Sequence, residues 1–251
     1  MEIYKLMSNE ERIIGHVARL WRYPVKSMRA EPLHSTRVWW HGFEGDRRYA
    51  FIRSSDYSHF PWLTGRQIPR MVQYQTHFKQ PDDPVKSPIL ITTPAGQQYV
   101  LEDEHLRQEL EKQAGEAVHL MQIGRGAYDS SAGISMISTN TLASFGQFLE
   151  DQPAVERFRC NILIETSGLE SYPEDSWTGS TLQFGERADS VCARIIRPIV
   201  RCMMINLDPK TAKQNPDVLR TVVNQHDTLA GVYGVPERVG SIVVGDKIRL
   251  L

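Results

Sequence analysis

The sequence predicts a mainly β protein of the α+β class, and three observations lead to this class. Most patterned stretches are short and rich in β-branched or aromatic residues, as strands are. Turn residues separate these stretches, whereas a doubly wound parallel sheet would need regularly alternating helices. Segments with helix caps are few, so we expect antiparallel β-barrels or sandwiches with a few packed helices.

The clearest strand signal lies at residues 71–78, where Val72, Tyr74, Thr76 and Phe78 occupy every second position. Such an alternation is typical of a strand with one buried face. Similar short stretches predict further strands at residues 15–23, 48–53, 89–93, 97–101, 117–123, 161–165, 190–200 and 241–251.

Capping signals predict three helices. Asp103 precedes a charged helix over residues 104–114, which Gly115 ends. A second helix is capped by Thr139 or Asn140, and a third starts at Asn215-Pro216, a cap followed by Pro in the first helical position. The charged helix separates two strand-rich halves, and 251 residues suffice for two small packed domains. We therefore expect one domain over residues 1–102 and another over residues 103–251.

The net charge is close to zero, because 29 Lys and Arg balance 30 Asp and Glu. The charge of the protein as a whole therefore gives no reason to expect that it binds nucleic acid or an anionic membrane. Acidic residues near the N-terminus stand where a secretory signal would be apolar, and no apolar run is long enough to span a bilayer. We expect a cytoplasmic protein. Its three cysteines fit neither a disulfide framework nor a zinc motif, so we expect reduced thiols.

Positive charge is concentrated locally. Between Arg19 and Arg70 the chain has ten basic residues and four acidic ones. Lys26 and Ser27 follow Pro24 on a predicted turn, and an ammonium beside a hydroxyl suits a phosphate or another small anion. The alternative is that these basic side chains are solvated surface groups or partners of nearby carboxylates.

Cys202 is the most informative thiol because Arg197 and Arg201 precede it closely. Nearby cations favour the thiolate, the form required of both a nucleophile and a ligand of soft metals. The alternative for any single cysteine in an apolar strand is a small buried side chain. We expect that buried role for Cys192, while Cys160 fits either the core or a pocket wall.

Seven sequence blocks carry a family resemblance when taken in order: LWRYPVKS (20–27), GDR (45–47), LTGRQIPR (63–70), RFRCNI (157–162), YPEDSW (172–177), RC with a later DP (201–202 and 208–209), and GSIVVGD (240–246). They resemble the MOSC-domain family, the molybdenum-cofactor-binding fold of cofactor sulfurases and amidoxime-reducing enzymes. The resemblance covers nearly the whole chain. It implies a small N-terminal β-barrel-like domain packed on a C-terminal MOSC β-barrel with a few helices.

The resemblance also implies a site for the molybdenum cofactor (Mo-molybdopterin). Cys202 matches the thiolate that ligates molybdenum, which makes it both the metal ligand and the catalytic residue. The positions that match cofactor-binding residues are Lys26, Ser27 and Arg47 for the pterin phosphate, Arg159 and Asn161 for the pterin, and Ser130 and Ser131 in the polar loop 128–131. Two positions depart from the family pattern, Cys160 where relatives usually have Pro and Ile199 where many have a second Cys.

The implied function is an oxidoreductase that reduces N-hydroxylated or N-oxygenated small molecules. No cysteine-rich extension for an iron–sulfur cluster is present in the sequence, so electrons would come from a separate flavin or iron–sulfur protein. The alternative is a non-catalytic module that carries the cofactor or transfers sulfur as a Cys202 persulfide. A third interpretation, a cysteine hydrolase, lacks a recognisable His/Asn signature.

Overall fold

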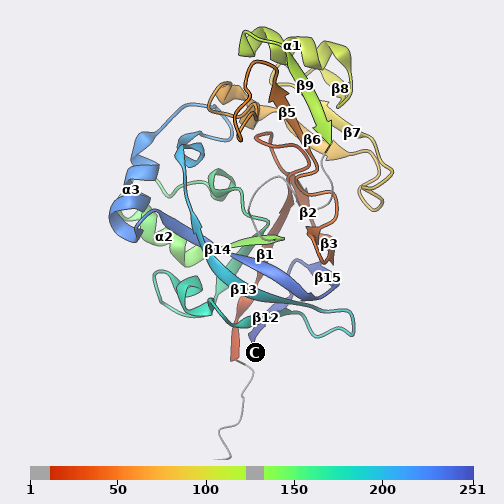
Figure 1. Cartoon of the computed structure of the whole chain (residues 1–251). Coiled ribbons are helices and arrows are strands. Elements are labelled where there is room, and N and C mark those ends of the chain that lie inside the picture. Colours follow the sequence, from red (N-terminus) through yellow and green to blue (C-terminus); the bar gives the residue numbers. More distant parts are fainter. Residues whose placement is uncertain (1–11, 123–132) are drawn as a thin grey trace, which may run out of the picture.

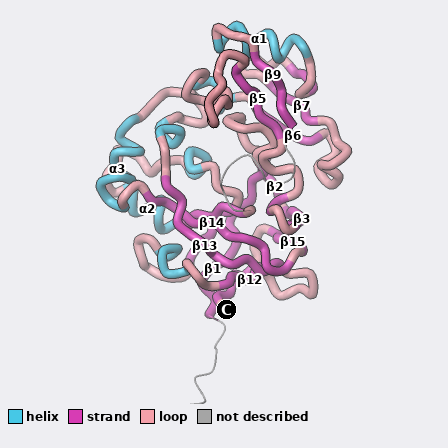
Figure 2. Tube along the Cα trace, in the orientation of Figure 1, coloured by secondary structure: helices cyan, strands magenta, loops and turns pink. Residues whose placement is uncertain are grey.

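The structure is a computed structural model, and it describes residues 12–122 and 133–251. Strands dominate these ranges, and the predicted mainly β, α+β class is confirmed (Figure 2). The strands are β1 (Arg12–Arg22), β2 (Glu31–Leu33), β3 (Ser35–Trp39), β4 (Gly42–Phe43), β5 (Tyr49–Arg53), β6 (Gln75–Phe78), β7 (Ile89–Thr92), β8 (Gln98–Val100), β9 (Val118–Gln122), β10 (Ile134–Ser138), β11 (Ile162–Thr166), β12 (Thr181–Phe184), β13 (Val191–Val200), β14 (Leu229–Arg238), β15 (Gly240–Val243) and β16 (Lys247–Leu250). The helices are α1 (Glu104–Ala114), α2 (Thr139–Gly146) and α3 (Pro216–His226), with 3₁₀ turns η1 (Pro69–Gln73), η2 (Val155–Phe158), η3 (Pro173–Trp177) and η4 (Met203–Asn206).

A closed barrel forms the larger part of the molecule. Its strands pair in the order β11-β10-β14-β13-β12-β16-β1, and β1 then pairs with β11 to close the ring. All of these pairs are antiparallel except β10 with β11. Alternate side chains fill the interior, where Val17, Ile195 and Val232 are fully buried.

A second lobe lies above the barrel in Figure 1 and contains β5 to β9 and α1. It consists of the β5-β9 pair and the β6-β7-β8 sheet, with its own apolar core around Phe51, Ile91 and Leu106. The first strand, β1, comes from the N-terminal part of the chain yet pairs with C-terminal strands. The barrel thus contains strands from both of the predicted ranges. The division into domains over residues 1–102 and 103–251 stays a prediction.

Helices α2 and α3 cover one side of the barrel (Figure 1). Together with η2 and η4 they enclose a third cluster of buried side chains, which includes Tyr23, Phe145, Phe158 and Cys160. The caps of α1 and α3 are as predicted, with the Asp103 and Asn215 side chains accepting backbone N–H groups. No helix within residues 12–122 and 133–251 is both long enough and apolar enough to cross a membrane. The cytoplasmic location stays a prediction.

Three local expectations need correction. The predicted strand at 71–78 begins only at Gln75, because Pro69 starts the 3₁₀ turn η1 and its turn residues Met71 and Val72 are both buried. The cap of α2 is Ser138, whose hydroxyl accepts from the Thr141 N–H at 3.0 Å. The predicted C-terminal strand is divided into β15 and β16 by a turn in which Gly245 has a φ of 94°.

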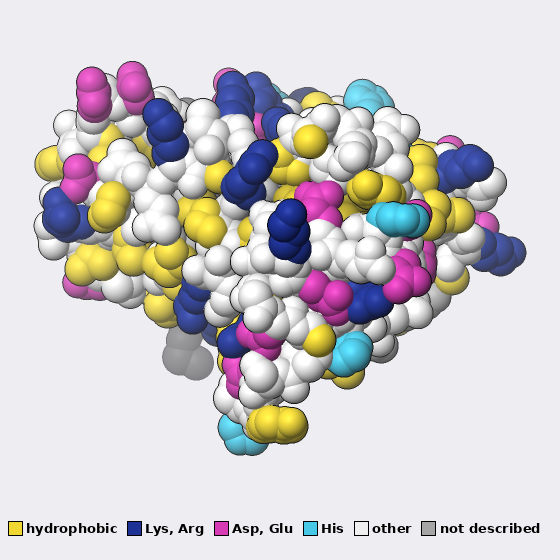
Figure 3. All heavy atoms as spheres, turned by 90° about the horizontal axis from the view of Figure 1, so that it is seen from above, with side chains coloured by type: hydrophobic (Ala, Val, Ile, Leu, Met, Phe, Trp, Pro, Cys, Tyr) yellow, Lys and Arg dark blue, Asp and Glu magenta, His cyan; other side chains and the backbone are white. Residues whose placement is uncertain are grey.

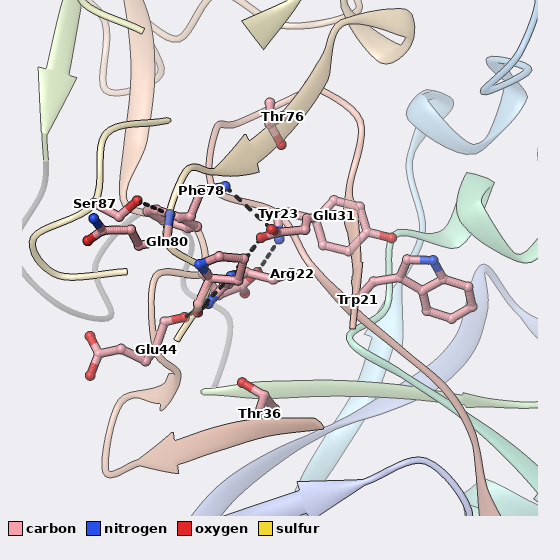
Figure 4. Close-up of polar contacts among 12 residues, drawn as sticks. Trp21, Arg22, Tyr23, Glu31, Thr36, Glu44, Thr76, Phe78, Gln80 and Ser87 are labelled. Carbon is pink, nitrogen blue, oxygen red and sulfur yellow. Dashed lines mark hydrogen bonds and ion pairs between the residues drawn. The ribbon is translucent and has the colours of Figure 1, made fainter. Parts of the chain in front are cut away.

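A buried ion pair between the paired strands β1 and β2 lies against the second lobe (Figure 4). Arg22 at the end of β1 donates to Glu31 Oε2 through Nε at 3.0 Å and Nη2 at 2.7 Å, and both side chains are buried. The Arg22 guanidinium also lies over the ring of Phe78 in β6, 4.5 Å from its centroid. This cluster fixes the end of β1 immediately before the predicted anion-binding turn at Lys26 and Ser27.

Candidate functional site

A cavity of about 500 Å³ brings together most of the residues predicted to form the site. One wall comes from the turn after β1 and the loop between β5 and η1. The other comes from η2, the end of β13 and η4. The cavity contains Lys26, Ser27, Arg47, Arg159 and Cys202, which come from positions far apart in the sequence. Ser130 and Ser131 lie outside the described residues.

The cavity is strongly cationic. Seven of its eighteen lining residues are basic and none is acidic, namely Lys26, Arg47, Arg66, Arg157, Arg159, Arg197 and Arg201. The face of the molecule seen in Figure 3 shows basic and acidic side chains interspersed, in keeping with a net charge of −1. Positive charge is therefore concentrated at the cavity, where it favours an anionic ligand.

Arg47 and Arg159 are fixed against Tyr23. Their guanidinium carbons lie 5.2 and 4.5 Å from the centroid of the Tyr23 ring. Arg47 forms an ion pair with Asp46 and donates to the Arg159 carbonyl at 2.8 Å, while Arg159 donates to the Met28 carbonyl at 2.8 Å. Burial raises the pKa of Tyr23, so this ring stays a neutral platform between two cations.

Three residues of the cavity wall adopt left-handed backbone conformations that non-glycine residues rarely take. Their φ angles are 65° for Ser27, 47° for Arg47 and 53° for Arg159. Such conformations are typical of functional sites because surrounding contacts must maintain them. Here the contacts of Arg47 and Arg159 described above hold the two cations of one wall in fixed positions.

Lys26 and Arg66 flank the half-exposed ring of Phe60. The Lys26 Nζ and the Arg66 guanidinium carbon each lie 5.6 Å from the centroid of that ring. Ser27 is buried, with 4% of its surface exposed, and lies on the tight turn that follows Val25. An ammonium, a hydroxyl and a guanidinium thus face the same space, a donor set suited to a phosphate.

Asn161 lies behind the cavity wall rather than in it. It is 1% exposed, and its Oδ1 accepts from the Ser135 N–H at 3.1 Å, the Ser135 hydroxyl at 2.8 Å and Arg47 Nη1 at 3.2 Å. Its Nδ2 donates to the Trp21 carbonyl at 3.2 Å. The structure therefore gives Asn161 a role in positioning Arg47, and its predicted contact with a cofactor stays a prediction.

The three thiols differ in accessibility. Cys202 is exposed, lines the cavity and immediately precedes η4. Cys192 is buried in the barrel sheet, and burial raises the pKa of its thiol. Cys160 is buried beside the cavity, where its sulfur accepts from Arg201 Nη2 at 3.1 Å. Cys202 is thus the one cysteine among the described residues that an incoming ligand can reach.

Two of the cavity's arginines are held by protein acceptors. Arg201 donates to the carbonyls of Ala230 at 2.8 Å and Phe158 at 2.5 Å as well as to Cys160. Arg157 donates to the Asn206 carbonyl at 2.9 Å and pairs with Asp208 at 2.9 Å. These contacts anchor η2 and η4 to each other and fix the backbone on both sides of Cys202.

Sequence reasoning singled out no role for several residues that line the cavity, including Thr64, Ser135, Arg157 and Tyr233. Arg157 and Thr64 belong to the blocks RFRCNI and LTGRQIPR, so those blocks held a signal for them. Tyr233 shows no local pattern that separates it from ordinary core aromatics. Only the pairing of the barrel strands places it at the cavity.

Comparisons with known proteins agree with this architecture. The chain matches the MOSC domain family over residues 99–249 and the MOSC N-terminal beta barrel domain family over residues 14–141. It is similar to mitochondrial amidoxime-reducing component 1 of Homo sapiens, with 26% identity over 95% of this chain and 83% of that protein. The similarity to human mitochondrial amidoxime reducing component 2 is 24% identity over 94% and 83% of the two chains.

Among solved structures, the YuaD protein from Bacillus subtilis aligns with 95% of this chain and 96% of its own, at 12% identity and a TM-score of 0.49. A similarity at that level supports no functional conclusion. The family matches are independent of it and confirm the resemblance seen in the sequence blocks. Because the MOSC domain match by itself covers more than half of the chain, the protein belongs to the MOSC family.

Proposed function

We propose that this protein binds the molybdenum cofactor in the cationic cavity and reduces N-hydroxylated or N-oxygenated small molecules. The observation that supports this most directly is the presence of an exposed thiol, Cys202, in a cavity with seven basic residues. The relatives named above as amidoxime-reducing components support the substrate class. A separate flavin or iron–sulfur protein would deliver the electrons.

The residues of the cavity fit the chemistry of this cofactor. Its phosphate is a dianion, and Lys26, Ser27 and Arg47 present ammonium, hydroxyl and guanidinium donors at one wall. Arg159 projects into the same space from a backbone that is already constrained. The volume of about 500 Å³ lies in the range of pockets that hold cofactors and drug-sized ligands.

Cys202 would be the side chain that ligates molybdenum, since thiolate sulfur is the protein donor best suited to this soft metal. When bound, the cofactor would supply the two electrons that remove the oxygen of an N–O group. The chain's own contribution is positional. Arg157 and Arg201 fix the segments around Cys202, and Asn161 fixes Arg47.

The loop that carries Phe60 and Arg66 forms the outer wall of the cavity. Phe60 is 44% exposed, so its ring offers a planar apolar surface at the entrance, flanked by two cations. Such a surface can hold the apolar body of a substrate by stacking while the N–O group points inward. Orientation of this kind lowers the entropic cost of reaching a reactive geometry.

The alternative function is a non-catalytic cofactor carrier or a sulfur-transfer module that uses a Cys202 persulfide. The exposure of Cys202 supports this alternative equally well, because a persulfide must be reachable by its acceptor. Turnover separates the two functions. A carrier binds stoichiometric cofactor but reduces no N-hydroxylated compound with any chemical reductant.

The test uses protein made in a host that synthesises the cofactor. Molybdenum is measured by elemental analysis and pterin by fluorescence after oxidation, in the wild type, Cys202→Ala and the matched control Cys192→Ala. We expect Cys202→Ala to lose molybdenum and N-reductive turnover, while the thermal unfolding of the cofactor-free protein stays unchanged because the side chain is exposed. Cys192→Ala should keep both metal and turnover. Full turnover by molybdenum-loaded Cys202→Ala would overturn the proposed ligand.

A further inference from the structure

A second cavity, of about 430 Å³, lies next to the first and shares Arg157, Arg159 and Met204 with it. Its remaining walls come from β1, from residues 29–33 and from the chain around η4. Apart from Tyr23, which supports Arg47 and Arg159, none of the residues that line this cavity alone has been assigned to the proposed cofactor site. The volume lies within the range of about 300 to 1,000 Å³ typical of small-molecule pockets.

Three charged side chains of this second cavity have no partner among the residues that the structure describes. Within residues 12–122 and 133–251, no side-chain hydrogen bond or ion pair engages Arg19, Arg29 or Glu156, all of which line it. The Trp21 indole also lines the cavity, and its N–H has no acceptor in the described part of the chain. Polar groups without protein partners that line one concave space are typical of a ligand site.

The local backbone of β1 directs side chains to this cavity. Its pairing with β11 changes register between Val17 and Arg19, so Ala18 is an extra residue in the strand. A bulge of this kind bends a strand and changes the direction of the adjacent side chains. Figure 4 shows that Trp21 and Tyr23 point to the opposite side of β1 from Arg22, and both line the second cavity.

The rest of the lining is mainly apolar. Leu20 and Leu33 face each other across the β1-β2 pair, and Val72, Leu207 and Pro209 complete this surface. The second cavity thus combines an apolar surface with Arg19 and Arg29, with the two arginines that it shares with the first cavity, and with one carboxylate and one indole N–H.

We propose that the second cavity binds a small organic anion with a flat apolar body. Its carboxylate, sulfonate or phosphate group would accept hydrogen bonds from Arg19 and Arg29, and its body would lie against Leu20, Leu33 and Val72. Glu156 would accept a hydrogen bond from a donor group on the ligand. This site adjoins the proposed cofactor site through Arg157, Arg159 and Met204, and the proposal does not depend on the identity of the cofactor.

The test measures the dissociation constants of 1-naphthoate and of its neutral isostere 1-naphthamide by isothermal titration calorimetry with the full chain. We expect 1-naphthoate to bind at least tenfold more tightly than the amide, and Arg19→Gln and Arg29→Gln to weaken its binding about tenfold each, as the loss of a charged hydrogen bond predicts. Arg19 is exposed, so its replacement should not disturb folding, which thermal unfolding will verify. Ala30→Leu narrows the cavity without removing a charge and should also weaken binding.

Two control variants locate the bound probe. Arg12→Gln removes an exposed charge of β1 that does not line the cavity, and Arg66→Gln removes a charge of the first cavity alone. Both should leave 1-naphthoate binding unchanged. The proposal is wrong if 1-naphthoate does not bind, if the amide binds equally well, or if Arg66→Gln weakens binding while Arg19→Gln does not. It is also wrong if Arg19→Gln lowers the pterin content of protein from a cofactor-producing host, because the second cavity would then belong to the cofactor site.

Discussion

Asn161 connects the barrel to the cationic cavity, and its replacement by alanine gives the sharpest test of this connection. The side chain is 1% exposed and forms four hydrogen bonds, with the Ser135 N–H, the Ser135 hydroxyl, Arg47 and the Trp21 carbonyl. The Asn161→Ala variant leaves the buried Ser135 N–H and the Trp21 carbonyl without this partner. Each such group costs about 1 to 3 kcal/mol.

The expected decrease in the free energy of unfolding is therefore about 2 to 6 kcal/mol. A water molecule that enters the space left by the amide would bring the decrease to the lower end of this range. In a chain of this size each kcal/mol lowers the melting temperature by about 2 to 4 °C. Because Arg47 also loses an anchor, we expect cofactor content to decrease as well.

The assay is urea unfolding of cofactor-free protein, followed by measurement of pterin in cofactor-loaded protein. Asn224→Ala, at an exposed position of α3, is the matched control and should change stability by less than about 0.5 kcal/mol. A change below about 1 kcal/mol for cofactor-free Asn161→Ala would refute the role of the network. If pterin content fell without such a change, Asn161 would contact the cofactor directly, as the sequence resemblance implied.

Three further predictions concern other buried polar groups. Glu31→Gln leaves the buried charge of Arg22 without its ionic partner and should cost about 3 to 5 kcal/mol by urea unfolding, whereas the double variant with Arg22→Met should recover part of that loss. Burial raises the pKa of Glu174, so the wild type should lose stability as the pH rises above about 4.5, the ordinary pKa of this carboxyl. Glu174→Gln should remove this loss, and unfolding curves at about pH 4 and about pH 8 that show the same difference between the two proteins would contradict it. Cys160→Ala leaves one N–H of Arg201 without its sulfur acceptor and should cost about 1 to 3 kcal/mol, so a thermal unfolding curve that matches the wild type would contradict the contact.

Local signals in the sequence predicted much of the secondary structure. The caps at Asp103 and Asn215 were identified correctly because capping depends on a few neighbouring residues. The strand predicted at 71–78 was partly wrong, since Pro69 and tertiary burial of Met71 and Val72 produce a 3₁₀ turn whose residues mimic alternation. Strand β14 was not predicted, although it pairs with both β10 and β13. Long-range pairing of this kind has no local signature.

The sequence by itself determined the family, the mainly β class and the chemistry available in the site. The ordered motif blocks, the basic residues between Arg19 and Arg70, and Cys202 can all be recognised in a linear chain. Only the tertiary structure decided which of these groups meet. It brings Lys26, Arg47 and Arg159 into one cavity with Cys202 and places Asn161 behind the wall. The physical reason is that sequence fixes residue type and local backbone preference, whereas accessibility and convergence depend on how distant strands pack.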